Sequence, residues 1–398
     1  MSALQGVVSA GWRLAGIALL VMLVGGVAPA AFAQSASGAI QRAAPPAQAP
    51  SAPPAAVLPA SLPPTVVPKA SPAAAPAAGP VVAPVPASAT PDTAAGAPLI
   101  EVLPPGQLRD CADCPLMVTV PAGEFRYGTQ PEAREADTTT GETPAWTVRL
   151  ARSFLLSRTE VTVAQYRAFA KATQHTVEPR CQAFAGGWVV EDGMDWQSAG
   201  EATLAPASPD LPVTCISWDD ARAYVEWLSS TTGQKYRLPS ELEWEYAARA
   251  GSSAARSFAT RDAVAESWDA TLCDNANVLD QDAVESYPPR LLGRWQANCR
   301  DGVAGLAVPG RFPPNAFDLL DLLGNAREWV QDCQTTSRNG GPLDGRAWEW
   351  SGCTLRGIRG GSFLSSPAAV RSAARERAVP SLRAFDLGFR VAREVAKP

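Results

Sequence analysis

The chain has 398 residues, a formal net charge of −5 and a single histidine, His175. The acidic balance argues against the basic footprint that nucleic-acid binding needs, so we expect no nucleic-acid partner. One histidine excludes a three-histidine zinc site, an HExxH metalloprotease and an iron centre with two histidines and one carboxylate.

The N-terminus has the pattern of a secretory signal peptide. Arg13 supplies positive charge, an apolar run covers residues 14–27, and Ala-Phe-Ala at 31–33 fits a small-residue cleavage site. We therefore expect residues 1–33 to be removed and the mature protein to be periplasmic or secreted. The alternative is an uncleaved inner-membrane anchor, because residues 14–33 are long enough to span a bilayer. Contact with a membrane is expected only through this segment.

Residues 34–105 differ in composition from the rest of the chain. This stretch holds 18 of the 37 prolines, and no aromatic residue occurs from residue 34 to residue 124. A segment with so little large apolar surface cannot offset its ordering entropy, so we predict a disordered Pro/Ala-rich linker. Residues 106–398 hold all eight cysteines and are predicted to form one domain.

An even number of cysteines in an exported chain indicates disulfides. We expect sequential pairing, although spacing alone does not fix the connectivity. Cys111 and Cys114 also have the spacing of a redox CxxC motif, but Pro115 follows them and no helix signal does. The expected pairs are Cys111–Cys114, Cys181–Cys215, Cys273–Cys299 and Cys333–Cys353.

The predicted domain opens with extended stretches at residues 117–120, 124–128 and 146–156, which are rich in β-branched and aromatic side chains. Three helices follow, each opened by a capping box. The boxes are Thr162 with Gln165, Ser217 with Asp220, and Ser240 with Glu243, and Gly233 and Gly251 end the second and third helices.

After residue 251 regular patterns are sparse. Short extended pieces occur near Ile358, near Arg371 and over residues 388–392. A few helices, short strands and long loops indicate a loop-rich α+β fold whose loops are held by disulfides or ions.

Two loops in this region offer side-chain and main-chain oxygens. Ca²⁺ takes six to eight oxygen ligands in flexible geometry, although Asn and Asp in loops more often make turns. A disulfide between Cys273 and Cys299 would bring the parts of the first loop together. The candidate ligands are Asn277, Val278, Asp301 and Val303 in the first site, and Asp321, Gly324, Ala326 and Glu328 in the second.

Several tryptophans lie in polar, loop-like sequence. They favour either a ligand groove with aromatic stacking platforms or a core that tryptophan supplies where secondary structure is thin. The groove candidates are Trp329, Trp348 and Trp350, with Trp188 and Trp196 in similar surroundings. Ser365 and Ser366 follow a glycine pair, but no general base is evident nearby, so we interpret them as loop serines.

Several motifs together resemble the sulfatase-modifying-factor (formylglycine-generating enzyme) domain family. They occur in family order from about residue 111 to residue 394. The resemblance implies a variant C-type-lectin-like α+β fold. The motifs cover residues 117–128, 236–249, 323–330, 359–363 and 387–392.

The resemblance also implies calcium as a structural cofactor. The family binds calcium through loops similar to the two described above, and the same eight residues correspond to its ligands. Asp321 stands where the family more often has Asn, a change that still supplies oxygen.

The same resemblance argues against formylglycine production. The enzymes of this family use two cysteines after an Arg-Gly-Gly-Ser segment to bind copper, and Ser365 matches the first of them. The second falls between Ser366 and Arg371, where there is no cysteine, so a soft ligand set for Cu(I) is missing and copper is not expected. Iron is not expected either, because iron-dependent relatives carry their histidine ligands in an additional domain.

We therefore expect an exported, calcium-stabilised module that binds a protein or a small-molecule ligand. The alternative is a periplasmic enzyme that performs oxidoreductase-type tailoring of an exported molecule. A periplasmic relative that acts in pyoverdine maturation shows that cysteine-poor members can retain activity. For that alternative the candidates at the ancestral site are Ser365, Arg359 and Arg375, with Arg327 and Glu328 nearby in sequence order.

Overall fold

The computed structural model describes residues 103–130, 140–184, 187–199, 208–258, 268–287 and 296–395. The expected signal peptide, and the linker up to residue 102, lie outside the described residues and stay predictions. In the part of the chain that the structure describes, no helix is long and apolar enough to cross a membrane.

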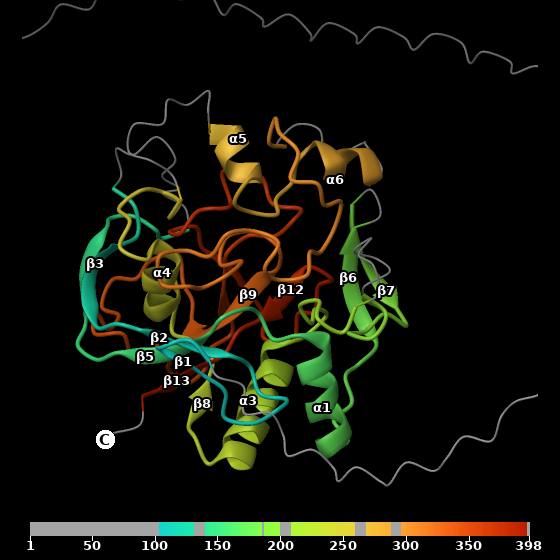
Figure 1. The fold of residues 1–398 in the computed structure, drawn as a ribbon, viewed down its shortest axis with the longest axis horizontal. Helices are drawn as coiled ribbons and strands as arrows, with labels where there is room; N and C mark the ends of the chain where they lie inside the picture. The colour runs from blue at the N-terminus through green and yellow to red at the C-terminus, as the bar shows by residue number, and fades with distance from the viewer. Residues whose placement is uncertain are drawn as a thin grey trace, which may run out of the picture. The chain divides into compact units, whose positions relative to one another are not determined.

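Two sheets form the framework of the domain (Figure 1). The five-stranded sheet joins the two ends of the domain, because the last strand pairs antiparallel with both β5 and β8. Its order is β1 (Gln107–Leu108), β2 (Met117–Val120), β5 (Phe154–Ser157), β13 (Ala392–Glu394) and β8 (Tyr236–Arg237). The four-stranded sheet has the order β11 (Glu376–Ala378), β10 (Arg356–Arg359), β9 (Arg327–Cys333) and β12 (Leu387–Phe389).

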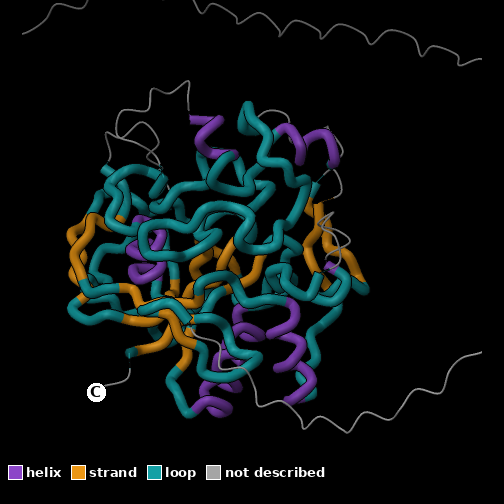
Figure 2. The backbone as a smooth tube through the Cα atoms, viewed as in Figure 1, coloured by secondary structure: helices purple, strands orange, loops and turns teal. Residues whose placement is uncertain are grey.

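Two antiparallel ribbons and five named helices complete the described elements. The ribbons are β3 (Gly123–Tyr127) with β4 (Trp146–Leu150), and β6 (Arg180–Phe184) with β7 (Trp188–Asp192). The helices are α1 (Val163–Thr173), α3 (Trp218–Thr232), α4 (Glu241–Arg249), α5 (Trp268–Cys273) and α6 (Gln281–Ser286). Figure 2 shows how much of the described chain is loop, as the sequence predicts.

The three predicted helices begin where their capping boxes place them. Thr162, Ser217 and Ser240 each accept a hydrogen bond from the backbone three residues on, and the reciprocal side-chain bond is present in all three. The predicted stretch 146–156 is two strands, because the exposed residues Ala151 and Arg152 turn the chain between β4 and β5. The segment near Arg371 is not a strand. The Arg371 side chain instead forms a buried ion pair with Glu142.

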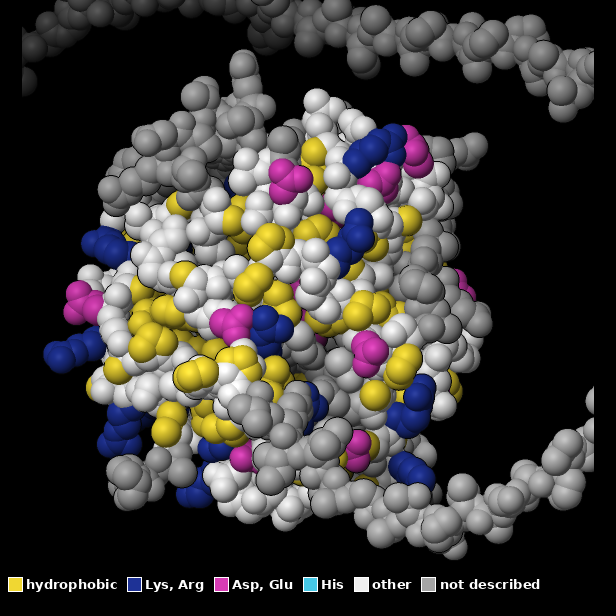
Figure 3. Space-filling model, viewed as in Figure 1, with side chains coloured by type: hydrophobic (Ala, Val, Ile, Leu, Met, Phe, Trp, Pro, Cys, Tyr) yellow, Lys and Arg dark blue, Asp and Glu magenta, His cyan; other side chains and the backbone are white. Residues whose placement is uncertain are grey.

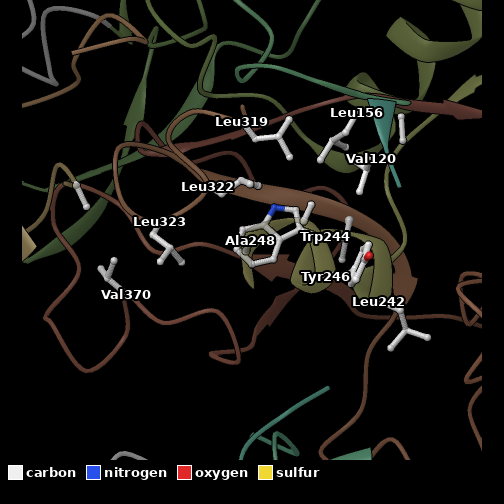
Figure 4. Packing of buried hydrophobic residues seen from close by; sticks show 14 of the residues in the cluster. Val120, Leu156, Leu242, Trp244, Tyr246, Ala248, Leu319, Leu322, Leu323 and Val370 are labelled. Atoms are coloured by element: carbon white, nitrogen blue, oxygen red, sulfur yellow. The ribbon is translucent and has the colours of Figure 1, made fainter. Parts of the chain in front are cut away.

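The core forms around tryptophans from α4 and β9. Trp244 is fully buried and is surrounded by leucines of the 319–323 loop, as Figure 4 shows. Trp329 is fully buried in a second cluster, and its indole nitrogen donates to the Ile216 carbonyl at 2.9 Å. The prediction that Trp329 lines a ligand groove is therefore wrong. The reason is that β9 lies between β10 and β12, so most of its side chains are buried.

Four disulfides join the pairs expected from sequential pairing. The Cys181–Cys215 bridge ties β6 to the segment just before α3, and Cys273–Cys299 joins the end of α5 to the loop after α6. Cys333–Cys353 closes the loop between β9 and β10. Disulfides of this number indicate an oxidising, non-cytoplasmic setting.

Candidate functional site

The structure brings the four residues of the first predicted cation site together. Asp301 is buried, and its two carboxylate oxygens accept hydrogen bonds from the Val278 amide at 3.0 Å and the Val303 amide at 2.8 Å. Asn277 precedes Val278 and is fully buried. The Cys273–Cys299 disulfide holds the two segments against each other, as the sequence suggests.

Asn277 has an unused oxygen at this place. Its amide nitrogen donates to the Gly305 carbonyl at 2.7 Å and to Asn325 Oδ1 at 3.1 Å. Its Oδ1 is buried and has no hydrogen-bond partner among the described residues. A buried acceptor without a partner is costly, and a hard cation that prefers oxygen ligands would satisfy it.

Two further acidic residues lie close to Asp301 and were missed in the sequence. Asp280, Asp282 and Asp301 each offer an oxygen, and these atoms lie within 4.8 Å of one another. Burial, together with the charge of Asp280, raises the pKa of Asp301 to about 7. The group can therefore hold a metal ion. The Asp-x-Asp spacing two residues after Val278 is the signal that could have found it.

The second predicted loop packs directly on the first. The Asn325 amide donates to the Asn277 carbonyl at 2.8 Å, and the preceding Gly324 amide donates to the Gly360 carbonyl at 3.0 Å. Gly324 has φ +86°, and a Cβ added there would lie 2.2 Å from the Asn277 carbonyl oxygen. Glycine is thus required where the two candidate loops meet.

Asp321 lies at the start of this second loop. It lines a pocket of about 160 Å³ whose walls include Pro313, Leu319 and Leu322. Burial raises the pKa of Asp321 to about 6, and the neighbouring Glu328 adds to the rise. One hydrogen bond to its carboxylate comes from the Gly310 amide, at 3.3 Å.

Glu328, expected to be a metal ligand, lies in a buried ion pair with Arg390, and its ligand role stays a prediction. Its Oε1 accepts two bonds from Arg390, at 2.9 and 2.7 Å, and its Oε2 accepts from Arg390 and from Trp244 Nε1, both at 2.7 Å. The carboxylate is fully buried and is shared by three N–H groups, because the single Nε proton of Arg390 faces both of its oxygens. The sequence does not reveal that Arg390 pairs with this carboxylate.

Ser365, which the family resemblance matches to the first copper-binding cysteine, is half-buried. Its Oγ accepts a hydrogen bond from the Ser362 amide at 2.9 Å. Ser362 in turn donates to Asp386 at 2.7 Å, and Asp386 pairs with Arg327 at 2.6 Å. All eight cysteines are in disulfides, so this polar cluster has no thiol from this chain.

Arg359 and Arg375 do not line this position. Both are buried, and Arg359 donates to Glu245 at 2.5 Å, whereas Arg375 donates to Glu241 at 2.7 Å. They are charge partners of α4 in the interior, and their proposed role as polar groups for a substrate is wrong. Their sequence spacing from Ser365 placed them near the site, but the glutamates of α4 draw them into the core.

Exposed aromatic side chains lie in two places. Trp348 and Trp350 pack edge to face with ring centroids 5.2 Å apart, and Trp350 is 39% exposed. Trp188 on β7 is 50% exposed, and the Arg327 guanidinium lies 5.6 Å from its ring centroid. Trp188 therefore places an aromatic surface beside the Ser362–Asp386 cluster. On the face seen in Figure 3, basic and acidic side chains are interspersed among apolar ones.

Comparisons with known proteins agree with this geometry. A family model described as a sulfatase-modifying factor enzyme 1-like domain matches residues 105–395. The formylglycine-generating enzyme of Thermomonospora curvata is 31% identical over 307 residues, which cover 69% of this chain and 92% of the relative. A protein of Mus musculus named inactive C-alpha-formylglycine-generating enzyme 2 is 27% identical over 72% of this chain and 88% of its own length.

A solved structure gives the fold. PvdO from Pseudomonas aeruginosa is similar to 74% of this chain and 100% of its own, with a TM-score of 0.60 and 33% sequence identity. The predicted variant C-type-lectin-like α+β fold is thus confirmed. Since the family model extends over nearly all of the described domain, the chain belongs to the sulfatase-modifying factor (formylglycine-generating enzyme-like) domain family.

Proposed function

We propose that this protein is an exported sulfatase-modifying-factor domain without formylglycine-generating activity, which serves as a calcium-stabilised module for binding a protein or a small molecule. The observation that carries the proposal is Ser365. The family resemblance matches this residue to a copper-binding cysteine, and its Oγ accepts a hydrogen bond from the Ser362 amide. A serine hydroxyl does not replace a soft thiolate as a ligand for Cu(I).

The disulfides support the same conclusion. A cysteine can bind copper only as a thiolate, and each of the eight cysteines is bonded to another cysteine. Among the relatives, the mouse protein named inactive has kept 27% identity over most of its length. The domain framework can thus be retained in a protein that is described as inactive.

Calcium is proposed as the structural ion of the two adjoining loops. Asn277 Oδ1, Asp301 and its neighbours Asp280 and Asp282 would hold an ion at the first loop. Carboxylate and amide oxygens are the ligand set that Ca²⁺ prefers. An ion there would neutralise the buried carboxylates of Asp280 and Asp301, while Asp282 is already paired with Arg300, and it would fix loops that contain little regular secondary structure.

The ligand would bind on the surface around Trp188. This ring is half-exposed, and Val189 and Val190 on the same strand are 38% and 51% exposed. The guanidinium of Arg327 lies beside the ring and is paired with Asp386. Exposed apolar side chains next to a few fixed polar groups are typical of recognition sites.

Incubation with a cysteine-containing sulfatase peptide, copper and oxygen tests the proposal. We expect mass spectrometry to detect no formylglycine, whereas the Thermomonospora curvata enzyme should convert the same peptide under the same conditions. Formation of formylglycine by this chain, abolished by Ser365→Ala, would overturn the proposal. As a matched control, Ser366→Ala changes the neighbouring hydroxyl and should leave either result unchanged.

A further inference from the structure

The loop between β9 and β10 contains the sequence Asn339-Gly340. An asparagine followed by a glycine occurs nowhere else among the 398 residues. Asparagine is chemically labile, because the backbone nitrogen of the next residue can attack its side-chain amide carbon. A glycine at the next position leaves that attack unobstructed, since it has no Cβ. The pair therefore has the composition of a deamidation site.

Both reacting groups are accessible in the structure. Asn339 and Gly340 are exposed. The Asn339 backbone amide donates to Ser337 Oγ at 3.2 Å, but its side-chain amide has no hydrogen-bond partner among the described residues. The turn is closed by the next amide, that of Gly341, which donates to the Arg338 carbonyl at 3.1 Å. The Gly340 nitrogen makes no hydrogen bond within the described residues, so none has to break before it attacks.

Gly340 owes its place to the backbone and not to packing. Its φ is +83°, in the left-handed region that favours glycine. A Cβ added there would meet nothing within 4 Å. A side chain at residue 340 can therefore block the attack on Asn339 without colliding with the rest of the domain.

The turn is held on both sides by buried or packed groups. Arg338 is buried, and its Nη1 donates to Glu241 at 2.8 Å and to Asp332 at 3.2 Å. On the other side Gly341 packs on Trp348, and a Cβ added to it would lie 3.0 Å from the indole ring. A change in the length of the main chain between these two anchors would therefore disturb their contacts.

We propose that Asn339 is a site of spontaneous deamidation in the folded protein. The Gly340 nitrogen loses its proton and bonds to Asn339 Cγ, the bond from Cγ to Nδ2 breaks, and ammonia leaves. Water then opens the resulting five-membered succinimide ring. Cleavage of the new bond from Cγ to nitrogen gives aspartate, whereas cleavage of the original peptide bond leaves the main chain running through Cγ as isoaspartate. Nothing is oxidised or reduced in these steps.

The two products differ in their effect on the fold. Aspartate at residue 339 adds a negative charge to an exposed side chain. Isoaspartate adds a carbon to the main chain inside the turn between Arg338 and Gly341. The Arg338 guanidinium lies 5.9 Å from the Trp348 ring centroid, so a longer turn should change both the indole fluorescence and the pairing of Arg338.

Peptide mapping by mass spectrometry of the purified full chain, after incubation at mildly alkaline pH, tests the proposal. Asn339 should lose its amide, whereas Asn275 and Asn315, which precede alanine and are hydrogen-bonded through their side chains, should keep theirs. Gly340→Ala should slow the loss at least about tenfold, because a Cβ obstructs the attack. Gly352→Ala is the matched control, with φ +82° and equally open surroundings in the same loop, and should react as the wild type does.

Two results would overturn the proposal. One is an intact Asn339 amide in the wild type when the urea-unfolded chain has lost it under the same conditions. The other is an undiminished loss in Gly340→Ala. Should Gly340→Ala fold poorly, Asn339→Gln decides the question, because its longer side chain would have to close a six-membered ring, and equal release of ammonia would contradict the mechanism.

The effect on the fold has its own comparison. Asn339→Asp should melt at the temperature of the fresh wild type, and incubated wild type that carries isoaspartate should melt lower. Isoaspartyl methylation measures the isoaspartate content of each sample. Equal melting temperatures for the isoaspartate-containing protein and Asn339→Asp would contradict the effect assigned to the longer turn.

Discussion

Glu241→Ala is expected to lower the free energy of unfolding by about 3–5 kcal/mol, because it leaves buried guanidinium groups without their carboxylate. Glu241 opens α4 and is fully buried. It pairs with Arg375 at 2.7 Å, with Arg338 at 2.8 Å and with Arg359 at 3.6 Å. Urea unfolding followed by circular dichroism measures the loss.

The matched control is Glu226→Ala in the exposed part of α3. Glu226 pairs with Arg222 one turn away, and both side chains are more than half exposed. A surface pair of this kind contributes only about 0.3–0.5 kcal/mol. Equal losses in the two variants would show that the buried network around Glu241 does not stabilise the fold.

At acidic pH the contribution of Glu241 to the free energy of unfolding should be lost. Burial by itself would raise its pKa, but Arg375, Arg359 and Arg338 hold it at about 2, below the ordinary value of 4.5. Since the pKa is lower in the folded protein, the stabilisation is complete above pH 4.5 and is lost as the pH falls towards 2. The difference in stability between wild type and Glu241→Ala should therefore shrink over that range.

Gly324→Ala should destabilise the domain by about 2–5 kcal/mol, the sum of a left-handed backbone strain and an overpacked contact. The added Cβ would lie 2.2 Å from the carbonyl oxygen of Asn277, which is backbone and cannot rotate away. The two candidate ion loops would be pushed apart. Thermal unfolding with and without calcium measures both effects, and the variant should respond less to calcium than the wild type does.

Gly106→Ala isolates the contact from the backbone strain. Gly106 has the same φ of +86°, but a Cβ added there meets nothing within 4 Å. Gly106→Ala should therefore lower the free energy of unfolding by only about 1 kcal/mol. A similar loss in the two variants would mean that the contact between Gly324 and Asn277 is not important for the fold.

The sequence predicted the features that depend on local chemistry. The three capping boxes each use residues three positions apart, so Thr162, Ser217 and Ser240 could be recognised as helix starts without knowledge of the fold. Asn277, Val278, Asp301 and Val303 were grouped correctly because the Cys273–Cys299 bridge brings their segments together.

The errors came from residues whose partners are distant in sequence. In the sequence Trp329 resembles a tryptophan in a loop, but in the structure its strand pairs with β10 and β12 and its side chain is buried. The pairing of Glu328 with Arg390, 62 residues later, likewise cannot be seen in the local sequence. Glu160 lies 165 residues before its partner Asn325, so no local pattern could indicate that it reaches the second loop. Only tertiary packing reveals these pairs.

The melting temperature of the purified protein in calcium and in excess chelator tests the central claim most directly. An ion present at 100 times its dissociation constant stabilises the folded state by about 2.7 kcal/mol, which corresponds to roughly 5–10 °C for a domain of this size. We expect chelation to lower the melting temperature by at least that amount, and Asp301→Ala to reduce the difference. An unchanged melting temperature on chelation and in Asp301→Ala would contradict a calcium-stabilised module.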